Sequence, residues 1–401
     1  MHFHCSILIP DDADMKNKNA PDPRGVRSKT LQKKAFSILV AALIAICLLE
    51  GILQSACRVT KGVWYPELRR REFPPLYEYD PNLRWRLRSN MNIRFRTGEF
   101  DTHVITDGRG IRMEDKENVA TVSQPEPDIL MIGDSFAFGW GVEAREAFAE
   151  RLGCSGKLRV LSLGVPGYGL EQEAIVLKAV LRREKPKLVI AQTWPIDWDI
   201  LNSDRMVVAE HYLLTGETVR RTSPSVIHLR IELMENSTLY GILTRFSSLS
   251  HHVFHRNELL GGFGLDAFKD GDQSEMIAGA RSRAFSAISG MKAAADAEGV
   301  PFAVVVVPSA FQVYPERQKS MERAWGISGR LDAERPDREL ESFAESRGIH
   351  LLDLLPAFRE RASAGRQSLY FRADPHWTAE GHELAAEAIR DFLNGRGLME
   401  R

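Results

Sequence analysis

The sequence has no excess of charge of either sign. Its 401 residues contain 53 Lys and Arg against 54 Asp and Glu, which gives a net charge of -1 at pH 7. A chain that binds nucleic acid carries a basic field, and this composition supplies none. We therefore expect no nucleic acid among the partners.

Cysteine and the common cofactor motifs are also scarce. The four cysteines include no C-x-x-C pair, too few for a disulfide framework or a cysteine zinc site. No phosphate loop or dinucleotide fingerprint occurs. His251 and His255 lie four residues apart, with His252 between them, but no carboxylate pattern accompanies them, so an exposed or interface role is favoured. We expect neither a metal nor a cofactor.

One long apolar run departs from an otherwise ordinary globular composition of 44% hydrophobic and 27% charged residues. Residues 35–53 contain a single charge, Glu50, and follow Lys33 and Lys34 directly. At about 1.5 Å per residue the run can cross a hydrocarbon layer of roughly 30 Å. A buried core helix would show a polar face, and a cleaved signal peptide would not follow so long a leading segment. We expect a transmembrane helix at 35–53.

The chain divides around this helix. Residues 1–34 are rich in Asp, Lys, Asn and Pro and are expected to form a disordered tail. Residues 54–122, here called the prelude, alternate in polarity at Asn92–Arg96 and Thr102–Thr106, which predicts a small strand-rich segment. Residues 123–401 form the main domain.

The main domain reads as alternating strands and helices. Short apolar runs without a polar face predict buried strands, and between them lie helical patterns such as 170–181 and 278–295. The runs are at residues 129–132, 158–163, 188–191, 302–307 and 350–352. This order predicts an α/β fold with a doubly wound parallel sheet. Residues from about 201 to 273 break the rhythm and are expected to be an insertion or lid.

Residues capable of catalysis follow the predicted strands. In such a sheet the ligand site lies beyond the carboxyl ends of the strands. Gly133-Asp134-Ser135 follows the first run, Gly164 and Gly167 follow the second, and Asp374-Pro375-His376 stands near the C-terminus.

A serine hydroxyl needs a base, and a histidine base needs a carboxylate that fixes its tautomer. With Pro375 limiting the backbone, the Asp374 and His376 side chains can point to the same side, which leaves the far ring nitrogen for Ser135. Glycines at 133, 164 and 167 would let backbone N–H groups approach a substrate oxygen.

Each of these pieces also has a purely structural interpretation. Gly-Asp-Ser is a common turn, His376 alone could sit in an interface, and Asp374 could cap the helix that follows it. The order of the pieces, each at a predicted strand end, favours the catalytic interpretation.

From Ile129 to Leu398 the sequence resembles the SGNH or GDSL-type serine hydrolases, which include esterases, lipases and polysaccharide-directed acetylesterases and acetyltransferases. The blocks that carry the resemblance are ILMIGDSF at 129–136, LGVPGYG at 163–169 and DPHWTAEGH at 374–382. It implies a flavodoxin-like three-layer fold with Ser135 as nucleophile, His376 as base and Asp374 as its partner. It also implies that the N–H groups of Ser135 and Gly164 bind the oxyanion.

The stretch from Tyr79 to Arg112 is similar to the prelude of membrane-anchored bacterial members of the family found with exopolysaccharide systems. This similarity implies a single-pass protein of the inner membrane with a periplasmic catalytic domain.

The third block departs from the family pattern. An asparagine that donates to the oxyanion is expected within residues 194–199, and Asp197 stands in its place. An ionised carboxylate about 4 Å from an oxyanion would cost about 4 kcal/mol at an effective dielectric constant of about 20. Either Asp197 is protonated or turned away, another donor such as Asn202 or the indole of Trp194 or Trp198 replaces it, or the chemistry has changed.

Three functions are compatible with these features. The first is a serine enzyme that hydrolyses or transfers an acyl group, most simply acetyl on a carbohydrate, with an acylated carbohydrate or small ester as substrate. The second is an inactive binding or assembly subunit that partners polysaccharide-assembly proteins. The third is a periplasmic lipase or esterase with residues 201–273 as its lid.

The membrane helix predicts a topology that can be tested. Residues 15–34 carry seven Lys and Arg against five in residues 54–73, a bias that favours an inside N-terminus. A reporter that works only after export should therefore be active when fused after Arg401, and a reporter that works only in the cytoplasm should be inactive at the same position. The reverse result would contradict the predicted orientation.

Overall fold

A computed structural model describes most of the chain. The described residues are 23–67, 76–80, 82–114, 126–195, 205–206, 219–220, 233, 236–240, 242–243, 266–268, 275–325, 331–365, 368–372 and 374–399. The chain divides into two compact units, Met1–Trp64 and Tyr65–Arg401.

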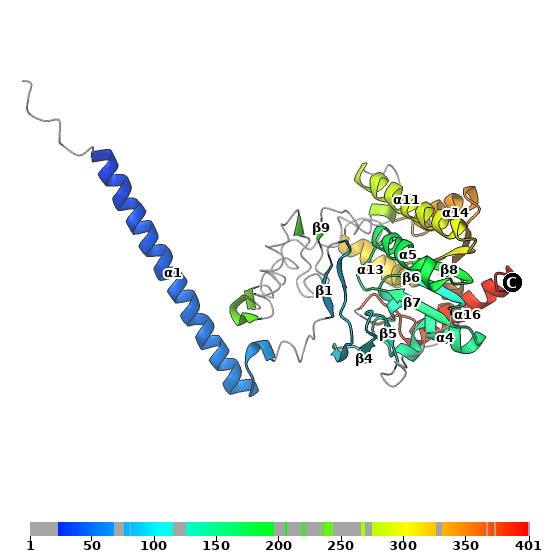
Figure 1. Cartoon of the computed structure of the whole chain (residues 1–401), viewed down its shortest axis with the longest axis horizontal. Coiled ribbons are helices and arrows are strands. Elements are labelled where there is room, and N and C mark those ends of the chain that lie inside the picture. The colour runs from blue at the N-terminus through cyan, green and yellow to red at the C-terminus, as the bar shows by residue number, and fades with distance from the viewer. Residues whose placement is uncertain are drawn as a thin grey trace, which may run out of the picture. The chain divides into compact units, whose positions relative to one another are not determined.

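The first unit contains one long helix, α1 (Pro23–Lys61) (Figure 1). Its segment Lys34–Lys61 has a mean hydropathy of 2.6, and none of its apolar window is buried. Among the described residues it is the one helix long and apolar enough to cross a membrane, although a signal sequence has the same features. Residues 23–34, which we expected to be disordered, are helical, because a helix continues as long as its backbone hydrogen bonds do and not only where its side chains suit lipid.

The second unit is built on a five-stranded parallel sheet. Its strands are β6 (Ile129–Gly133), β7 (Val160–Gly164), β8 (Leu188–Thr193), β11 (Phe302–Val306) and β12 (His350–Asp353). Their order in the sheet is β12-β11-β8-β6-β7, so the direction of winding reverses at β6. This is the flavodoxin-like order, and all five predicted strands belong to it. The prediction of a doubly wound α/β fold is confirmed.

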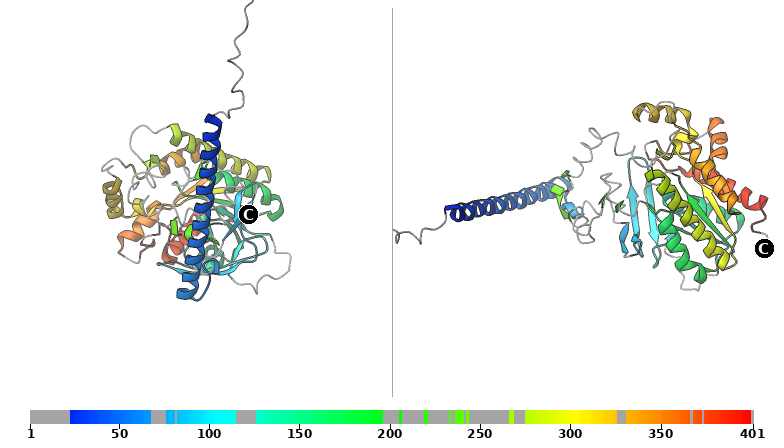
Figure 2. Two further views of the ribbon diagram at one scale, coloured as in Figure 1. Left: turned by 90° about the vertical axis from the view of Figure 1, so that its left-hand side faces the viewer. Right: turned by 90° about the horizontal axis from the view of Figure 1, so that it is seen from above.

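Helices connect these strands and cover both faces of the sheet (Figures 1 and 2). Their bounds are α3 (Ser135–Phe138), α4 (Phe148–Gly156), α5 (Leu170–Glu184), α11 (Glu275–Ala297), α12 (Ala310–Val313), α13 (Pro315–Trp325), α14 (Arg335–Ser346), α15 (Leu355–Ser363) and α16 (Ala379–Gly395). The described part of this region also contains two 3-10 turns, Ala144–Glu146 and Asp266–Phe268. It contains one short antiparallel pair, β9 (Arg205–Met206) with β10 (Val219–Arg220).

Alternate residues of each strand face opposite layers of helices. In β6, Ile129 and Met131 join the core beneath α4, α15 and α16. Leu130 and Ile132 join the core beneath α5, α11 and α14. Because side chains alternate across a strand, a strand that is apolar at every position needs cover on both faces. The uninterrupted apolar runs of the sequence therefore have a direct structural cause.

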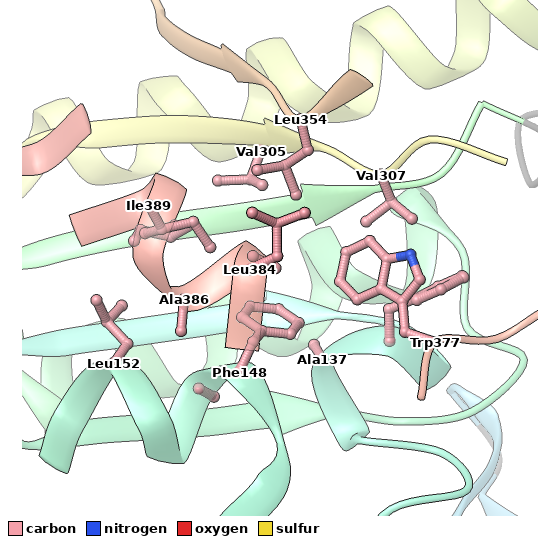
Figure 3. Packing of buried hydrophobic residues seen from close by; sticks show 14 of the residues in the cluster. Ala137, Phe148, Leu152, Val305, Val307, Leu354, Trp377, Leu384, Ala386 and Ile389 are labelled. Atoms are coloured by element: carbon pink, nitrogen blue, oxygen red, sulfur yellow. The ribbon is translucent and has the colours of Figure 1, made fainter. Parts of the chain in front are cut away.

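The first of these cores fastens the C-terminal segment to the sheet (Figure 3). Trp377 is fully buried and lies against Phe148 of α4, with ring centroids 5.9 Å apart. Leu384 and Ile389 of α16 enter the same cluster as Val305 of β11. This packing fixes the chain that follows residue 376.

The part of the prelude that the structure describes contains five strands. A hairpin is formed by β1 (Tyr77–Asp80) and β2 (Arg84–Leu87), and an antiparallel sheet by β3 (Asn92–Arg96), β4 (Asp101–Thr106) and β5 (Arg112–Met113). Phe95 and Phe100 of this second sheet share one buried cluster with Phe138 and Trp140 of the main domain. The prelude thus packs directly on the segment that follows β6.

Burial of His382 predicts that the domain loses stability in acid. Its imidazole is fully buried in α16, and burial lowers the pKa of His382 to about 3. The unfolded state binds this proton near pH 6.5 and the folded state does so only near pH 3, so protonation favours unfolding between these values. The free energy of unfolding should fall toward acid with a contribution of up to about 1.4 kcal/mol per pH unit.

His382→Asn removes this titration and retains an acceptor for the Phe148 N–H, which donates to His382 Nδ1 over 3.3 Å. Urea unfolding of both proteins from pH 7 to pH 4 should show a shallower loss for the variant, whatever its stability at pH 7. Equal slopes would contradict a neutral His382 in the folded state.

Candidate active site

Ser135 lies at the N-terminus of α3, immediately beyond the carboxyl end of β6. Asp134 caps this short helix, and its Oδ1 accepts the Phe136 N–H over 2.7 Å. Asp134 is itself tied to the neighbouring strand β8. Its N–H donates to Gln192 Oε1 over 3.1 Å, and Gln192 Nε2 donates to Asp134 Oδ2 over 3.2 Å. These buried bonds fix the backbone that presents Ser135.

The structure brings Ser135, His376 and Asp374 into one hydrogen-bonded chain. His376 Nε2 lies 2.6 Å from Ser135 Oγ, although 241 residues separate the two along the sequence. His376 Nδ1 lies 2.6 Å from Asp374 Oδ1. With Asp374 ionised, the Nδ1–H donates to the carboxylate, and Nε2 is left as the acceptor for the serine proton.

The Asp374 carboxylate remains ionised despite its partial burial. Burial alone would raise its pKa, but hydrogen bonds and charge from His376 outweigh this, and the pKa of Asp374 lies below its ordinary value. The Trp140 indole N–H donates to the other oxygen, Oδ2, over 3.3 Å. Both carboxylate oxygens thus have donors.

Aromatic rings surround the imidazole and limit its contact with water. The ring of Phe136 lies 4.9 Å from that of His376, and the ring of Trp140 lies 5.9 Å away. Ser135 is buried to 9% exposure. A partly dry environment strengthens each hydrogen bond of the chain.

Gly164 ends β7 beside α3. A Cβ at this position would lie 2.3 Å from the Phe138 nitrogen, so close packing alone requires glycine here. Pro166 and Gly167 follow in a tight turn in which the Tyr168 N–H donates to the Val165 carbonyl and Gly167 has a φ of +80°. The backbone of this block therefore lies next to the nucleophile segment.

The third sequence block is described only in part. Trp194 follows β8 and packs on Phe136 with ring centroids 5.3 Å apart, and its indole N–H donates to Ser309 Oγ over 2.8 Å. Asp197, Trp198 and Asn202 lie outside the described residues, as does most of the expected insertion at 201–273.

Three residues of the site were not identified from the sequence: Gln192, Trp140 and Arg112. Gln192 is a polar residue within an apolar strand, and this is the one sequence signal among the three. Arg112 is half-buried, and its guanidinium donates to the carbonyl oxygens of Phe138, Gly139 and Val142 over 2.9, 2.6 and 2.6 Å. Burial lowers the pKa of Arg112 to about 10, so it stays charged at neutral pH.

Within the described part of the chain, no group of three or more His, Cys, Asp or Glu side chains could hold a metal ion. The histidines at 251, 252 and 255 lie outside it. The described site contains the groups needed for acyl transfer by a serine.

Comparison with known proteins identifies a family similar to the C-terminal third of the chain. Residues 270–400 match the family described as "SGNH hydrolase-like domain, acetyltransferase AlgX". The matched segment includes β11, β12 and the block that contains Asp374 and His376, and it confirms the resemblance to the SGNH superfamily. None of the curated proteins matches the chain closely enough to count as a relative.

Distant similarities extend over more of the chain. A GDSL-like lipase from Bacteroides thetaiotaomicron is 13% identical with a TM-score of 0.35, over 69% of this chain and 94% of that one. A putative acylhydrolase from Bacteroides fragilis is 14% identical with a TM-score of 0.34, over 71% and 99%. The acetyl xylan esterase AlAXEase is 12% identical with a TM-score of 0.37, over 66% and 98%.

The hydrogen-bonded chain predicts the effect of Asp374→Asn. An amide can donate to His376 Nδ1 and so favours the tautomer with its proton on Nε2, which cannot accept the serine proton. Reaction of Ser135 with an activated fluorophosphonate should slow by roughly three to four orders of magnitude. Glu380→Gln removes a carboxylate from the first turn of α16 and serves as the control, with an unchanged rate. Full reactivity of Asp374→Asn would remove Asp374 from the mechanism.

Proposed function

Because the SGNH resemblance holds for the segment that carries Asp374 and His376, we propose that the chain is a serine hydrolase or acyltransferase of this type. Ser135 is the nucleophile, His376 the general base and Asp374 the carboxylate that orients the base. The observation that carries the proposal is the pair of hydrogen bonds of 2.6 Å that links the three side chains.

The proposed reaction proceeds through an acyl-enzyme. Ser135 Oγ attacks the ester carbonyl while His376 Nε2 takes the hydroxyl proton. The tetrahedral intermediate collapses, the C–O bond to the alcohol breaks, and His376 returns the proton to that alcohol. Water or a second hydroxyl group then attacks the acyl-serine by the same steps in reverse.

The negative oxygen of the intermediate requires hydrogen-bond donors. We assign this role to the N–H groups of Ser135 and Gly164, with Asp197 as a third donor in its protonated form. Removal of one such donor costs about 3 kcal/mol of transition-state stabilisation in enzymes of this class. A protonated carboxyl group can donate as an asparagine does.

For the substrate we propose an O-acyl group, and in particular O-acetyl, on a carbohydrate. Two observations support acetyl: the acetyltransferase named in the matched family, and the polysaccharide-directed members that the sequence resembles. An apolar helix near the N-terminus supports a single-pass anchor in the inner membrane with the site in the periplasm. Polysaccharide-assembly proteins are the expected partners.

Reactivity of Ser135 separates an enzyme from an inactive binding subunit. An activated fluorophosphonate should label the full-length protein in detergent at Ser135, as located by peptide mass mapping. The protein should also release acetate from an acetylated oligosaccharide faster than it hydrolyses long-chain esters, whereas the opposite preference would favour a lipase. Absence of labelling would favour the binding subunit.

Ser135→Ala and His376→Ala should each abolish acetate release, and the double variant should be no worse than either single one. Residues that act as one unit are not additive. Thermal unfolding of all three variants should stay within a few degrees of the unmodified protein. Losses that multiply in the double variant would argue against a shared proton transfer.

A further inference from the structure

The loop between Tyr370 and Trp377, which carries Asp374 and His376, is hydrogen-bonded to a residue of the prelude. Glu99 lies in the turn between β3 and β4, and its carboxylate accepts two backbone N–H groups of this loop. The Arg372 N–H donates to Glu99 Oε1 over 2.8 Å, and the Asp374 N–H donates to Oε2 over 2.7 Å. The two segments are more than 270 residues apart in the sequence.

The turn that carries Glu99 is held in a defined shape. The Thr97 hydroxyl accepts the N–H groups of Glu99 and Phe100 over 3.2 Å each. The Thr97 N–H donates to the Phe100 carbonyl over 2.8 Å and closes the turn. Because the backbone on both sides of Glu99 is fixed, its carboxylate is presented in one direction.

Phe100 docks this turn against the loop. Its ring lies 5.3 Å from the ring of Phe371 and 6.1 Å from that of Trp140. The contact leaves no spare room, because a Cβ on Gly141 would lie 2.5 Å from Phe371 and 3.2 Å from Phe100. The turn, the loop and the segment after the nucleophile helix therefore meet at one place.

The consequence concerns the geometry of Asp374. Its carboxylate must face His376 Nδ1, and the direction of that side chain follows from its backbone. Within the loop itself, the Phe371 N–H donates to the His376 carbonyl over 3.0 Å and the His376 N–H donates to Asp374 Oδ1 over 2.9 Å. Glu99 adds a hydrogen bond from outside the loop, which it accepts from the Asp374 N–H.

We propose that Glu99 is a positioning residue, which holds the Asp374 backbone so that its carboxylate faces His376. The proposal rests on the proposed function for the role of Asp374, and it gives the prelude a part in catalysis. Glu99 acts on the reaction only through Asp374 and does not contact the reacting atoms.

Two variants test this on the full-length protein in detergent. Glu99→Ala removes both acceptors and should slow fluorophosphonate labelling of Ser135 about tenfold. Glu99→Gln retains one carbonyl acceptor and should lie between Glu99→Ala and the unmodified protein. Hydrolysis of 4-nitrophenyl acetate should lose kcat with KM unchanged.

Asp101→Asn is the matched control. Asp101 begins β4 in the same hairpin, pairs with Arg94 and Arg96, and carries the same charge as Glu99. In Asp101→Asn, fluorophosphonate should label Ser135 at the rate of the unmodified protein. This result would exclude a general effect of lost charge or of a weakened hairpin. A slowing equal to that of Glu99→Ala would overturn the proposal.

A double-mutant comparison distinguishes positioning from a general structural role. In an Asp374→Asn background, Glu99→Ala should cause no further slowing, because its effect passes through the Asp374 carboxylate. A further slowing of the same size as in the unmodified background would overturn the proposal.

A readout that needs no activity separates this proposal from the proposed function. The His376 Nδ1–H, bonded to a carboxylate, should give a downfield proton resonance that Asp374→Asn removes. Glu99→Ala should weaken or shift this resonance and Asp101→Asn should not. An unchanged resonance in Glu99→Ala would overturn the positioning role. If the resonance depends on Glu99 but fluorophosphonate never labels Ser135, the positioning role stands and only the proposed enzymatic function is contradicted.

Discussion

A serine hydroxyl becomes a nucleophile only when a base accepts its proton within hydrogen-bond distance. The histidine that lies at this distance from Ser135, His376, is 241 residues away in the sequence, and the fold must bring the two together. The sheet places Ser135 where the winding order reverses, a position at which a parallel sheet opens a crevice beyond its strand ends. Burial of Trp377, one residue after the base, anchors the other partner to the same core.

Four other side chains restrict the positions of the segments that carry Ser135 and Asp374. Gln192 holds Asp134 before the nucleophile, and Arg112 holds the three carbonyl groups that follow it. Trp140 donates to the Asp374 carboxylate, and Glu99 accepts from the Asp374 backbone. Two of these four residues, Arg112 and Glu99, come from the prelude, which is therefore a part of the candidate site.

The sequence was most informative where a local pattern has a local physical cause. Apolar runs located all five parallel strands, and the runs are uninterrupted in β6 and β11, where every residue is buried because helices cover both faces. The position after β6 located Ser135, because it lies at the carboxyl end of that strand. Asp374 and His376 lie between α15 and α16 and not at a strand end, so the resemblance of their sequence block located them and the expected strand end did not. Glu99 and Trp140 could not be found in this way, since their roles depend on contacts between segments far apart in the chain. Nothing around an exposed glutamate in a polar turn indicates that its carboxylate meets two distant backbone N–H groups.

The carboxyl groups show why burial alone does not identify a functional acid. Burial, together with the charge of Asp134, raises the pKa of Glu173 well above its ordinary value, and burial raises the pKa of Asp337 to about 8. Asp337 receives one hydrogen bond, from Gln312, and its other oxygen has no partner among the described residues. Burial therefore favours the neutral form of both groups.

Asp374 is also withdrawn from water, yet its pKa is lowered, because His376 and Trp140 donate to its two oxygens. An orienting carboxylate must remain charged to stabilise the imidazolium that forms when His376 takes the serine proton. The donors to both of its oxygens, together with its smaller burial, distinguish Asp374 from Glu173 and Asp337. A residue that fixes the directions of these hydrogen bonds acts on the site through this carboxylate.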